Sequence, residues 1–487
     1  MRMLTLLEMT QHPRKPVMVF PRIFLSEWEQ LVLAPVANFA SPQPAGWFYR
    51  DIWFEPLIEK YNERVYPFVK KRRAYFGKIL IIMNKKVCNN NNNNRCASCN
   101  KIDNIENPHA KLTRYEHKND KKPHIIDLRS DVLTQQSPEM KEFMMAAEVG
   151  DDVFQEDPTT IALEHKVADM LQKEAALFVL SGTMGNLLCV MTHCDKRGSE
   201  ILLGNLSHIH LWEQGNISQL GGVHSHLLEN LPDGTFHLDE LKDSVRADNI
   251  HLPSTRLVCI ENTHNQLGGK VLPIPWLDEL GNCCRELGIP IHVDAARLMN
   301  AAVVLDVPPA RLVKDCTSVC LCLSKGLGAP VGSVIAGPRD FIERARRLRK
   351  ALGGGVRQPG MLAAAGIYGL DHVPSLLWKD HAHAKAIAKA VSDLGSPLIK
   401  ADVEGVQTNI LLLECDMKVV LPDKLCSRLM KVTPEEESAL GERIVVKSFA
   451  MAKTSVRFVL YFNVTFEDVQ RVIRKLVYVI EEYEGKV

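Results

Sequence analysis

Residues 289–297, Ile-Pro-Ile-His-Val-Asp-Ala-Ala-Arg, form an apolar run that ends in an acidic residue and continues with small ones. An apolar run without alternation is typical of a parallel strand that is covered on both faces. Similar runs, rich in Val, Ile, Leu and Cys, recur at residues 176–180, 201–203, 257–260, 318–323 and 331–336. Helical patterns of about ten to fifteen residues separate them, and this alternation predicts an α/β domain with a largely parallel sheet.

The chain changes character near residue 123 and again near residue 372. We therefore expect a large α/β domain over residues 124–372 and a smaller α+β domain over residues 373–487. In the smaller domain, strands are expected at 408–413, 443–449 and 456–461, followed by an amphipathic helix that closes the chain.

Residues 1–123 show no regular period and include a run of asparagines at 89–94. Because such tracts are typical of low-complexity, disorder-prone segments, we expect a poorly ordered extension. Cys96 and Cys99 have half the spacing of a zinc site, but no second pair follows at a suitable distance. We therefore expect no metal.

The overall composition is that of an ordinary globular protein. Lys and Arg number 59 and Asp and Glu 58, so the net charge favours neither nucleic acid nor an anionic membrane as a partner. Most of the thirteen cysteines lie in apolar runs, as Cys189 and Cys259 do, which favours a reducing compartment without disulfides. We find neither a secretory leader nor an apolar stretch of the roughly 18 residues that a membrane helix needs. The expectation is a cytoplasmic protein.

Chemistry in an open parallel sheet gathers at the carboxyl ends of the strands. The first motif there is residues 180–186, Leu-Ser-Gly-Thr-Met-Gly-Asn, a strand that leads through a tight turn into a helix. Small residues such as Gly182 let the backbone close on an anion, and the first amides of a helix favour a phosphate. The alternative is an ordinary strand-to-helix turn capped by Thr183.

The second motif is the end of the opening stretch, where Asp294 follows an apolar strand. A carboxylate at this position can pair with a protonated pyridine nitrogen, and Arg297 can reach the same site. The alternative is a helix-capping aspartate with a surface arginine.

The third motif is residues 321–330, Leu-Cys-Leu-Ser-Lys-Gly-Leu-Gly-Ala-Pro. Lys325 passes straight from a buried strand into a glycine-rich loop, and partial desolvation there favours the neutral amine that attacks a carbonyl. Most lysines are solvated surface charges, so the position of this one in the sequence is what points to catalysis.

Four further residues can supply charge or move protons. His208 and His264 both follow expected strands and could lie over a cofactor ring or transfer a proton. Arg357, after three glycines, and Arg457, in a late strand, could each bind a carboxylate through the guanidinium. A loop histidine or a solvated strand arginine is the commoner role of such residues.

From about residue 126 onward the chain resembles the low-specificity L-threonine aldolases of the β-eliminating lyase superfamily, which are fold-type I pyridoxal-phosphate enzymes. The resemblance is carried, in this order along the sequence, by Asp127-Leu-Arg-Ser-Asp131, Gly150-Asp-Asp-Val153 with Glu156-Asp-Pro158, Ser181-Gly-Thr-Met-Gly-Asn186, Glu261-Asn-Thr-His264 with Gly268-Gly269, His292-Val-Asp-Ala-Ala-Arg297, Ser324-Lys-Gly-Leu327 and Gly353-Gly-Gly355 with Arg357-Gln358. The family covers three quarters of the chain, and residues 1–123 have no counterpart in it.

The resemblance implies a site for pyridoxal 5'-phosphate. Lys325 would carry the cofactor as a Schiff base, the internal aldimine, and Asp294 would hold the pyridine nitrogen. Arg297 would contact the region of the ring hydroxyl, and Gly182 and Thr183 would bind the phosphate.

The resemblance also implies how the substrate binds. His208 would stack on the ring face and His264 would lie near the substrate's β-hydroxyl. Ser130, Arg357 and Arg457 would fix the amino acid or its carboxylate. The expected reaction is cleavage of L-threonine or L-allo-threonine to glycine and an aldehyde by a homodimer or homotetramer.

The sequence departs from the family pattern at two places. Ala295 stands where the family usually has glycine, and Arg457 is followed by Phe-Val-Leu-Tyr-Phe where the family commonly has Leu-Val-Thr-His. Two other activities stay open on the same scaffold. One is β-elimination, and the other is a catalytically weak relative that binds the cofactor.

Overall fold

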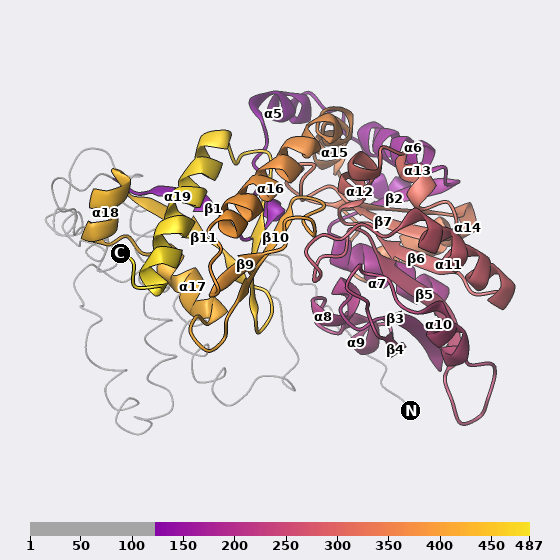
Figure 1. Ribbon diagram of the computed structural model, residues 1–487. Coiled ribbons are helices and arrows are strands. Elements are labelled where there is room, and N and C mark those ends of the chain that lie inside the picture. The colour runs from indigo at the N-terminus through magenta and orange to yellow at the C-terminus, as the bar shows by residue number, and fades with distance from the viewer. Residues whose placement is uncertain (1–121) are drawn as a thin grey trace, which may run out of the picture. The chain divides into compact units, whose positions relative to one another are not determined.

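The computed structural model describes residues 122–487 (Figure 1). Our expectations for the extension, including the cysteine pair at 96 and 99, concern residues outside the described part of the chain. Among residues 122–487, no helix is both long and apolar enough to cross a membrane.

A seven-stranded sheet forms the centre of the large domain. Side by side, its strands are β2 (Ala175–Val179), β8 (Ser333–Gly337), β7 (Ser318–Cys322), β6 (Ile291–Asp294), β5 (Ser254–Glu261), β3 (Ser199–Gly204) and β4 (His224–Leu228). Only β8 pairs antiparallel to its neighbours, β2 and β7. The predicted mostly parallel sheet is confirmed, and the prediction missed β4 at the sheet edge.

Helices cover both faces of this sheet, as the unalternating apolar runs require. Along β7, Val319 and Leu321 belong to one hydrophobic core and Cys320 to another on the opposite face. On the first face lie α5 (Pro138–Met145), α6 (Pro158–Leu171), α10 (Leu238–Ser244), α11 (Ile274–Leu287), α12 (Leu298–Leu305), α13 (Pro309–Leu312) and α15 (Gly360–His372). On the second lie α7 (Gly182–His193), α8 (His208–Leu211), α9 (Asn216–Gln219) and α14 (Arg339–Ala351).

The C-terminal part has its own core and two small sheets. One sheet is antiparallel, with the order β12 (Phe449–Ala450), β13 (Ser455–Val459), β10 (Ile410–Cys415) and β9 (Ile399–Ala401). The helices are α16 (Leu377–Asp393), α17 (Pro422–Leu429), α18 (Pro434–Leu440) and α19 (Phe466–Tyr483). The last helix is the predicted amphipathic one. Thr465 and Asp468 form a reciprocal capping box at its start.

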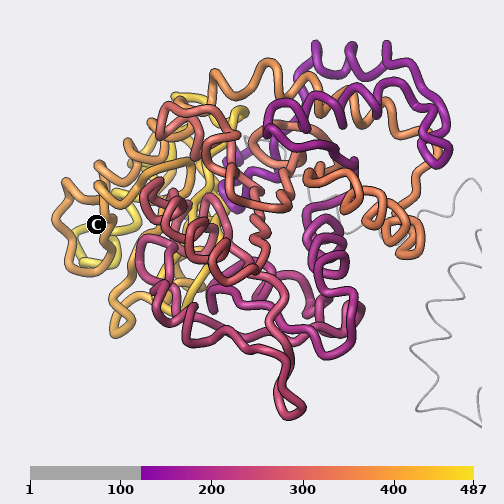
Figure 2. The backbone as a smooth tube through the Cα atoms, turned by 90° about the vertical axis from the view of Figure 1, so that its right-hand side faces the viewer, coloured from indigo at the N-terminus to yellow at the C-terminus, as the bar shows by residue number. Residues whose placement is uncertain are grey.

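The other small sheet joins the first described strand to the C-terminal part. β1 (His124–Asp127) pairs in parallel with β11 (Ile444–Lys447), and both views show it beside the C-terminal elements (Figures 1 and 2). The run predicted as one strand at 443–449 is interrupted at Ser448, because β11 pairs with β1 whereas β12 pairs with β13. The division of the chain at residue 372 stays a prediction.

Candidate active site

The sequence predicts that residues 180–186 and the strand before Lys325 belong to a cofactor site. In the structure these two segments lie against each other at the carboxyl end of the central sheet. Helix α7 follows β2, and Ser181 caps it by accepting a hydrogen bond from the Met184 backbone amide. The cap is therefore Ser181, and Thr183 lies in the first turn. A Cβ added to Gly182 would come within 2.6 Å of Cys322 Sγ, so this turn packs directly on the strand that leads to Lys325. The free amides of the turn fit a phosphate.

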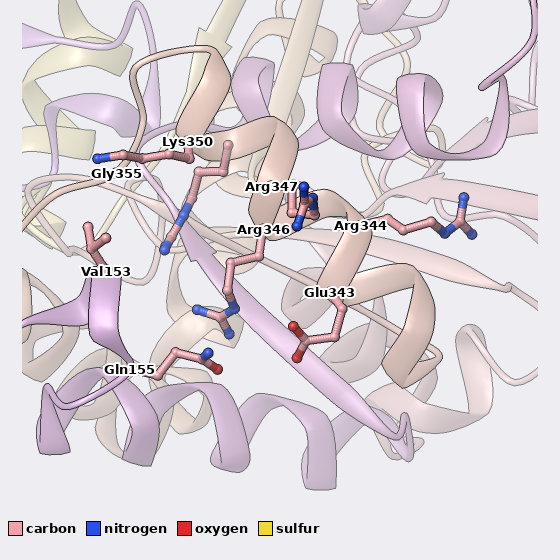
Figure 3. A pocket seen from close by; sticks show the side chains of 9 residues that line it. Val153, Gln155, Glu343, Arg344, Arg346, Arg347, Lys350 and Gly355 are labelled. Carbon is pink, nitrogen blue, oxygen red and sulfur yellow. The ribbon is translucent and has the colours of Figure 1, made fainter.

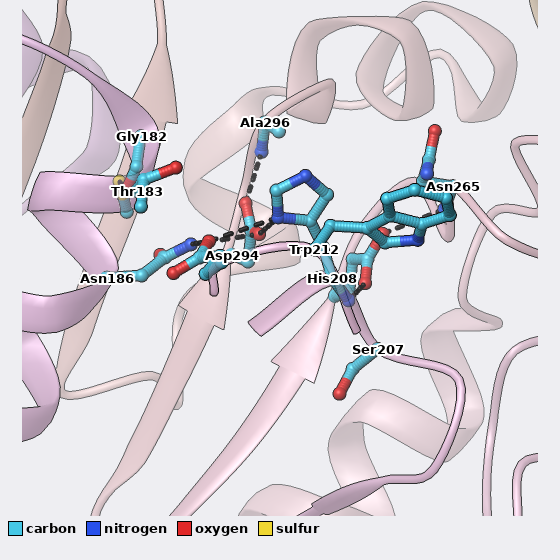
Figure 4. Close-up of polar contacts among 12 residues, drawn as sticks. Gly182, Thr183, Asn186, Ser207, His208, Trp212, Asn265, Asp294 and Ala296 are labelled. Carbon is cyan, nitrogen blue, oxygen red and sulfur yellow. Dashed lines mark hydrogen bonds and ion pairs between the residues drawn. The ribbon is translucent and has the colours of Figure 1, made fainter. Parts of the chain in front are cut away.

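Asp294, the last residue of β6, is buried and held from two sides (Figure 4). Its Oδ2 accepts a hydrogen bond from Asn186 Nδ2 at 3.0 Å, and its Oδ1 accepts one from the Ala296 amide at 3.2 Å. Asn186 Nδ2 also donates to Glu213 Oε1 at 2.8 Å. Two buried carboxylates thus face each other across one amide. A protonated ring nitrogen fits such an acceptor set, as the sequence predicts for Asp294.

His208 points at the same carboxylates from the start of α8. Its Nδ1 lies 3.0 Å from Glu213 Oε1 and 4.0 Å from Asp294 Oδ2. Burial acts to lower the pKa of His208, but the hydrogen bond to Glu213 and the charge of Asp294 outweigh it, so the pKa is raised. The protonated imidazole is therefore favoured here.

The sequence analysis gave no role to Asn186, in the quoted stretch 180–186, or to Glu213. Both are buried polar side chains. A polar residue in the apolar first half of a helix is a signal that could have marked Asn186, since a buried polar group needs a partner. Nothing in the local sequence shows that this partner is Asp294, 108 residues away.

Arg297 forms a buried, bidentate ion pair with Asp131. Its Nε and Nη2 donate to the two carboxylate oxygens at 2.7 and 2.8 Å. Asp131 follows Ser130, which caps the short helix η1 (Asp131–Leu133). Burial acts to raise the pKa of Asp131, but the charge and hydrogen bonds of Arg297, aided by the charge of Lys325, lower it. Lys325 therefore lies within electrostatic reach of Asp131, as it does of His208.

A second guanidinium, that of Arg457, joins this group from β13. Arg297 and Arg457 both donate from Nη1 to Asn265 Oδ1, at 3.2 and 2.8 Å. Burial and the charge of Arg297 lower the pKa of Arg457 to about 10. Its Nε is buried without a partner in the described part of the chain. Arg457 has no ion pair within residues 122–487, so a substrate carboxylate can neutralise its charge.

Two predicted residues are not joined to this group by any contact within residues 122–487. His264 is buried, and neither of its ring nitrogens has a hydrogen-bond partner there. Arg357 is more than half exposed, pairs with Asp151 Oδ2 at 2.8 Å and lies over the Phe154 ring. Their roles at the site stay predictions.

A basic hollow of about 430 Å³ lies between α14 and η2 (Asp152–Phe154) (Figure 3). Its inner arginines are already paired. Arg346 donates to Glu164 at 3.0 Å, and Arg349 donates to Asp152 at 2.6 Å and to the Phe178 carbonyl oxygen at 2.6 Å. These arginines therefore hold α14 against its neighbours.

Asp380, on α16, should make the stability of the fold depend on pH. Burial and the charge of Asp131 raise the pKa of its carboxyl from 3.8 to about 7. Between these two pH values the folded state keeps a proton that the unfolded state has lost, so stability falls as pH rises. We expect Asp380→Asn to raise the free energy of unfolding at pH 8 by up to about 4 kcal/mol and to leave it nearly unchanged at pH 4.

Urea unfolding of both proteins at pH 4, 6 and 8 measures this difference. The exposed Asp393→Asn, on the same helix, is the control. Equal gains at all three pH values would contradict a titrating Asp380.

Comparison with known proteins shows the family of the chain. The beta-eliminating lyase family matches residues 127–416. A probable low-specificity L-threonine aldolase of Arabidopsis thaliana is 42% identical over 72% of this chain and 95% of its own length. The low specificity L-threonine aldolase of Escherichia coli K12 is 39% identical over 72% of this chain and 97% of its own length. A putative L-allo-threonine aldolase of Listeria monocytogenes has the same fold, with a TM-score of 0.59 at 19% identity, over 73% of this chain and 96% of that one. The chain belongs to the beta-eliminating lyase family, among its low-specificity L-threonine aldolases.

Proposed function

We propose that the protein cleaves the Cα–Cβ bond of β-hydroxy-α-amino acids, L-threonine and L-allo-threonine among them, to glycine and an aldehyde with pyridoxal phosphate. The observation that carries this proposal is that Asp294, buried beside Asn186 and His208, ends β6 three residues before Arg297, which shares Asn265 Oδ1 with Arg457. One group suits the cofactor and the other suits an amino-acid carboxylate.

Named residues would hold the cofactor. The Lys325 amine would bind it covalently, the first turn of α7 with Gly182 and Thr183 would bind its phosphate, and Asp294 would keep its ring nitrogen protonated. When bound, pyridoxal phosphate supplies an electron sink for the pair of electrons that the breaking Cα–Cβ bond leaves on Cα.

The arginines decide which bond breaks. Arg457, with the unpartnered Nε, would bind the substrate carboxylate, and Ser130 and Arg357 are the further candidates for this contact. A fixed carboxylate would orient the bonds of Cα and so select the Cα–Cβ bond for cleavage.

One histidine must take the proton of the β-hydroxyl. The raised pKa of His208 favours its protonated form, which suits a group that stacks on the ring and donates a proton. His264, with two buried and unpartnered ring nitrogens, is the residue we assign to accept the hydroxyl proton, directly or through a water. A proton added to Cα then completes glycine.

We also propose a homodimer or homotetramer as the working form, and the cytoplasm as its compartment. The cysteines of residues 122–487 are buried and unbonded, as a reducing compartment favours.

Analysis of the products tests the proposed function. The full chain with added pyridoxal phosphate is expected to release acetaldehyde and glycine in equal amounts from L-threonine and from L-allo-threonine. L-2-aminobutyrate, which lacks the hydroxyl, is the control and should give neither. Ammonia and a 2-oxo acid instead would establish β-elimination. A preparation that binds the cofactor and releases no product would support the catalytically weak relative.

A further inference from the structure

A chain of hydrogen bonds runs through the buried interior behind Asp294. His193 Nε2, at the end of α7, lies 2.9 Å from Ser318 Oγ, at the start of β7. Ser318 Oγ lies 2.9 Å from His292 Nδ1, in β6. His292 Nε2 lies 3.1 Å from Asn186 Oδ1, and Asn186 donates to Asp294. We call these four residues, His193, Ser318, His292 and Asn186, the relay.

The chemistry of the groups fixes the direction of every bond in the relay. A carboxylate only accepts hydrogen bonds, so Asn186 must turn its NH₂ toward Asp294 and Glu213 and its oxygen toward His292. His292 must then carry its proton on Nε2, and Nδ1 must accept from the Ser318 hydroxyl. The Ser318 oxygen in turn accepts from His193 Nε2.

Both histidines of the relay are neutral, with one ring proton each. Burial lowers the pKa of His292 to about 4 and that of His193 to about 3, so both rings are neutral at physiological pH. His292 and Ser318 are fully buried, and water does not compete for these bonds. The order of donors and acceptors therefore has one solution.

The amide of Asn186 would be costly in its other orientation. Flipped, its oxygen would face the Asp294 carboxylate. The carboxylate therefore sets the orientation of the amide, and the hydrogen bond from His292 Nε2 to Asn186 Oδ1 anchors the amide in that orientation from its other side.

We propose that His292 is a positioning residue that, through Asn186, fixes the Asp294 carboxylate against the ring nitrogen of pyridoxal phosphate. The inference rests on the cofactor of the proposed function, and it adds a role for side chains that touch neither the cofactor nor the substrate. Loss of the His292 side chain should therefore weaken cofactor binding and make the ring nitrogen of the cofactor lose its proton more readily.

Cofactor titration of His292→Leu tests the proposal. Cofactor-free full-length protein is titrated with pyridoxal phosphate by visible absorbance, and the pH midpoint of the absorbance change is then measured on the loaded protein. We expect the dissociation constant to rise by up to about tenfold, the upper end of the scale for losing one hydrogen bond between neutral groups. The pH midpoint should move upward, because a ring nitrogen that loses its proton no longer disfavours a proton on the Lys325 nitrogen.

Two further variants separate positioning from packing. His292→Gln keeps a donor and an acceptor and should recover most of the wild-type dissociation constant. Ser318→Ala removes the hydrogen bond between Ser318 and His292 with little loss of side-chain volume. It should raise the dissociation constant and the pH midpoint, but less than His292→Leu does. If His292→Leu does not fold, Ser318→Ala still tests the relay.

The control is His381→Leu. His381 is another histidine with a pKa lowered by burial to about 4, and it bonds Asn300 outside the relay. His381→Leu should leave both the dissociation constant and the pH midpoint as in the wild type. Wild-type values in both His292→Leu and Ser318→Ala would overturn the proposal, and so would a His292→Gln as impaired as His292→Leu. These readings need no turnover, so they stay valid if the wild type binds the cofactor but fails to cleave threonine.

Discussion

Replacing Lys325 with alanine is expected to lower glycine release from L-threonine by roughly 10³-fold or more, the scale of removing a covalent or proton-transferring group from an active site. The position of Lys325 is the reason. It follows β7, whose residues are buried on both faces, and its charge is felt by both Asp131 and His208.

Two measurements on Lys325→Ala check this expectation. Product release measures the loss of activity, and the visible absorbance of the loaded protein shows whether the cofactor is still covalently held. The control is Lys314→Ala, which removes a partly exposed lysine that pairs with Asp278. A Lys325→Ala protein that retained most of its activity, or that showed the absorbance of the wild type, would contradict the assignment of Lys325.

Much of the fold could be predicted because its signals are local. The runs at 289–293 and 318–323 are apolar without alternation, and in the structure both faces of β6 and β7 are covered. The edge strand β4, His-Ser-His-Leu-Leu, was not predicted because it is short, largely polar and only partly buried. The pairing of β1 with β11 was not predicted, because four residues do not show which sheet they join and β11 is 320 residues away in sequence (124 to 444).

The sequence could predict a site residue only where the motif around that residue was enough to indicate its chemistry. Asp294 and His208 lie together as the motifs predict, since Asp294 ends β6 and His208 follows β3 at the same sheet edge. Glu213 and the relay could not be found this way, because their roles depend on partners brought together by the fold. Tyr461, which departs from the family pattern, donates to the Asp127 carbonyl at 3.0 Å and so ties the end of β13 to β1.

Arg457→Met is expected to raise KM for L-threonine by about 10²-fold, with a smaller fall in kcat, because a charge-assisted guanidinium–carboxylate contact is worth about 2–3 kcal/mol. Arg457 donates from Nη2 to the Arg129 carbonyl at 2.9 Å and from Nη1 to Asn265. These bonds hold the guanidinium in place, while Nε has no partner among residues 122–487. Arg457→Lys keeps the charge and loses the planar fork, so its KM should fall between the two.

Steady-state kinetics and cofactor absorbance together test the role of Arg457. The absorbance of the loaded protein should not change, since Arg457 is assigned to the substrate and not to the cofactor. Arg474→Met, which removes a partly exposed arginine paired with Glu442, is the control.

The pKa of Arg457, lowered to about 10, adds an independent check. A base with a lowered pKa keeps its charge below that value, so the wild-type KM should stay level through neutral pH and rise as pH passes about 10, and this rise should be absent in Arg457→Met. An unchanged KM in Arg457→Met, with the protein folded, would move carboxylate binding to Ser130 or Arg357.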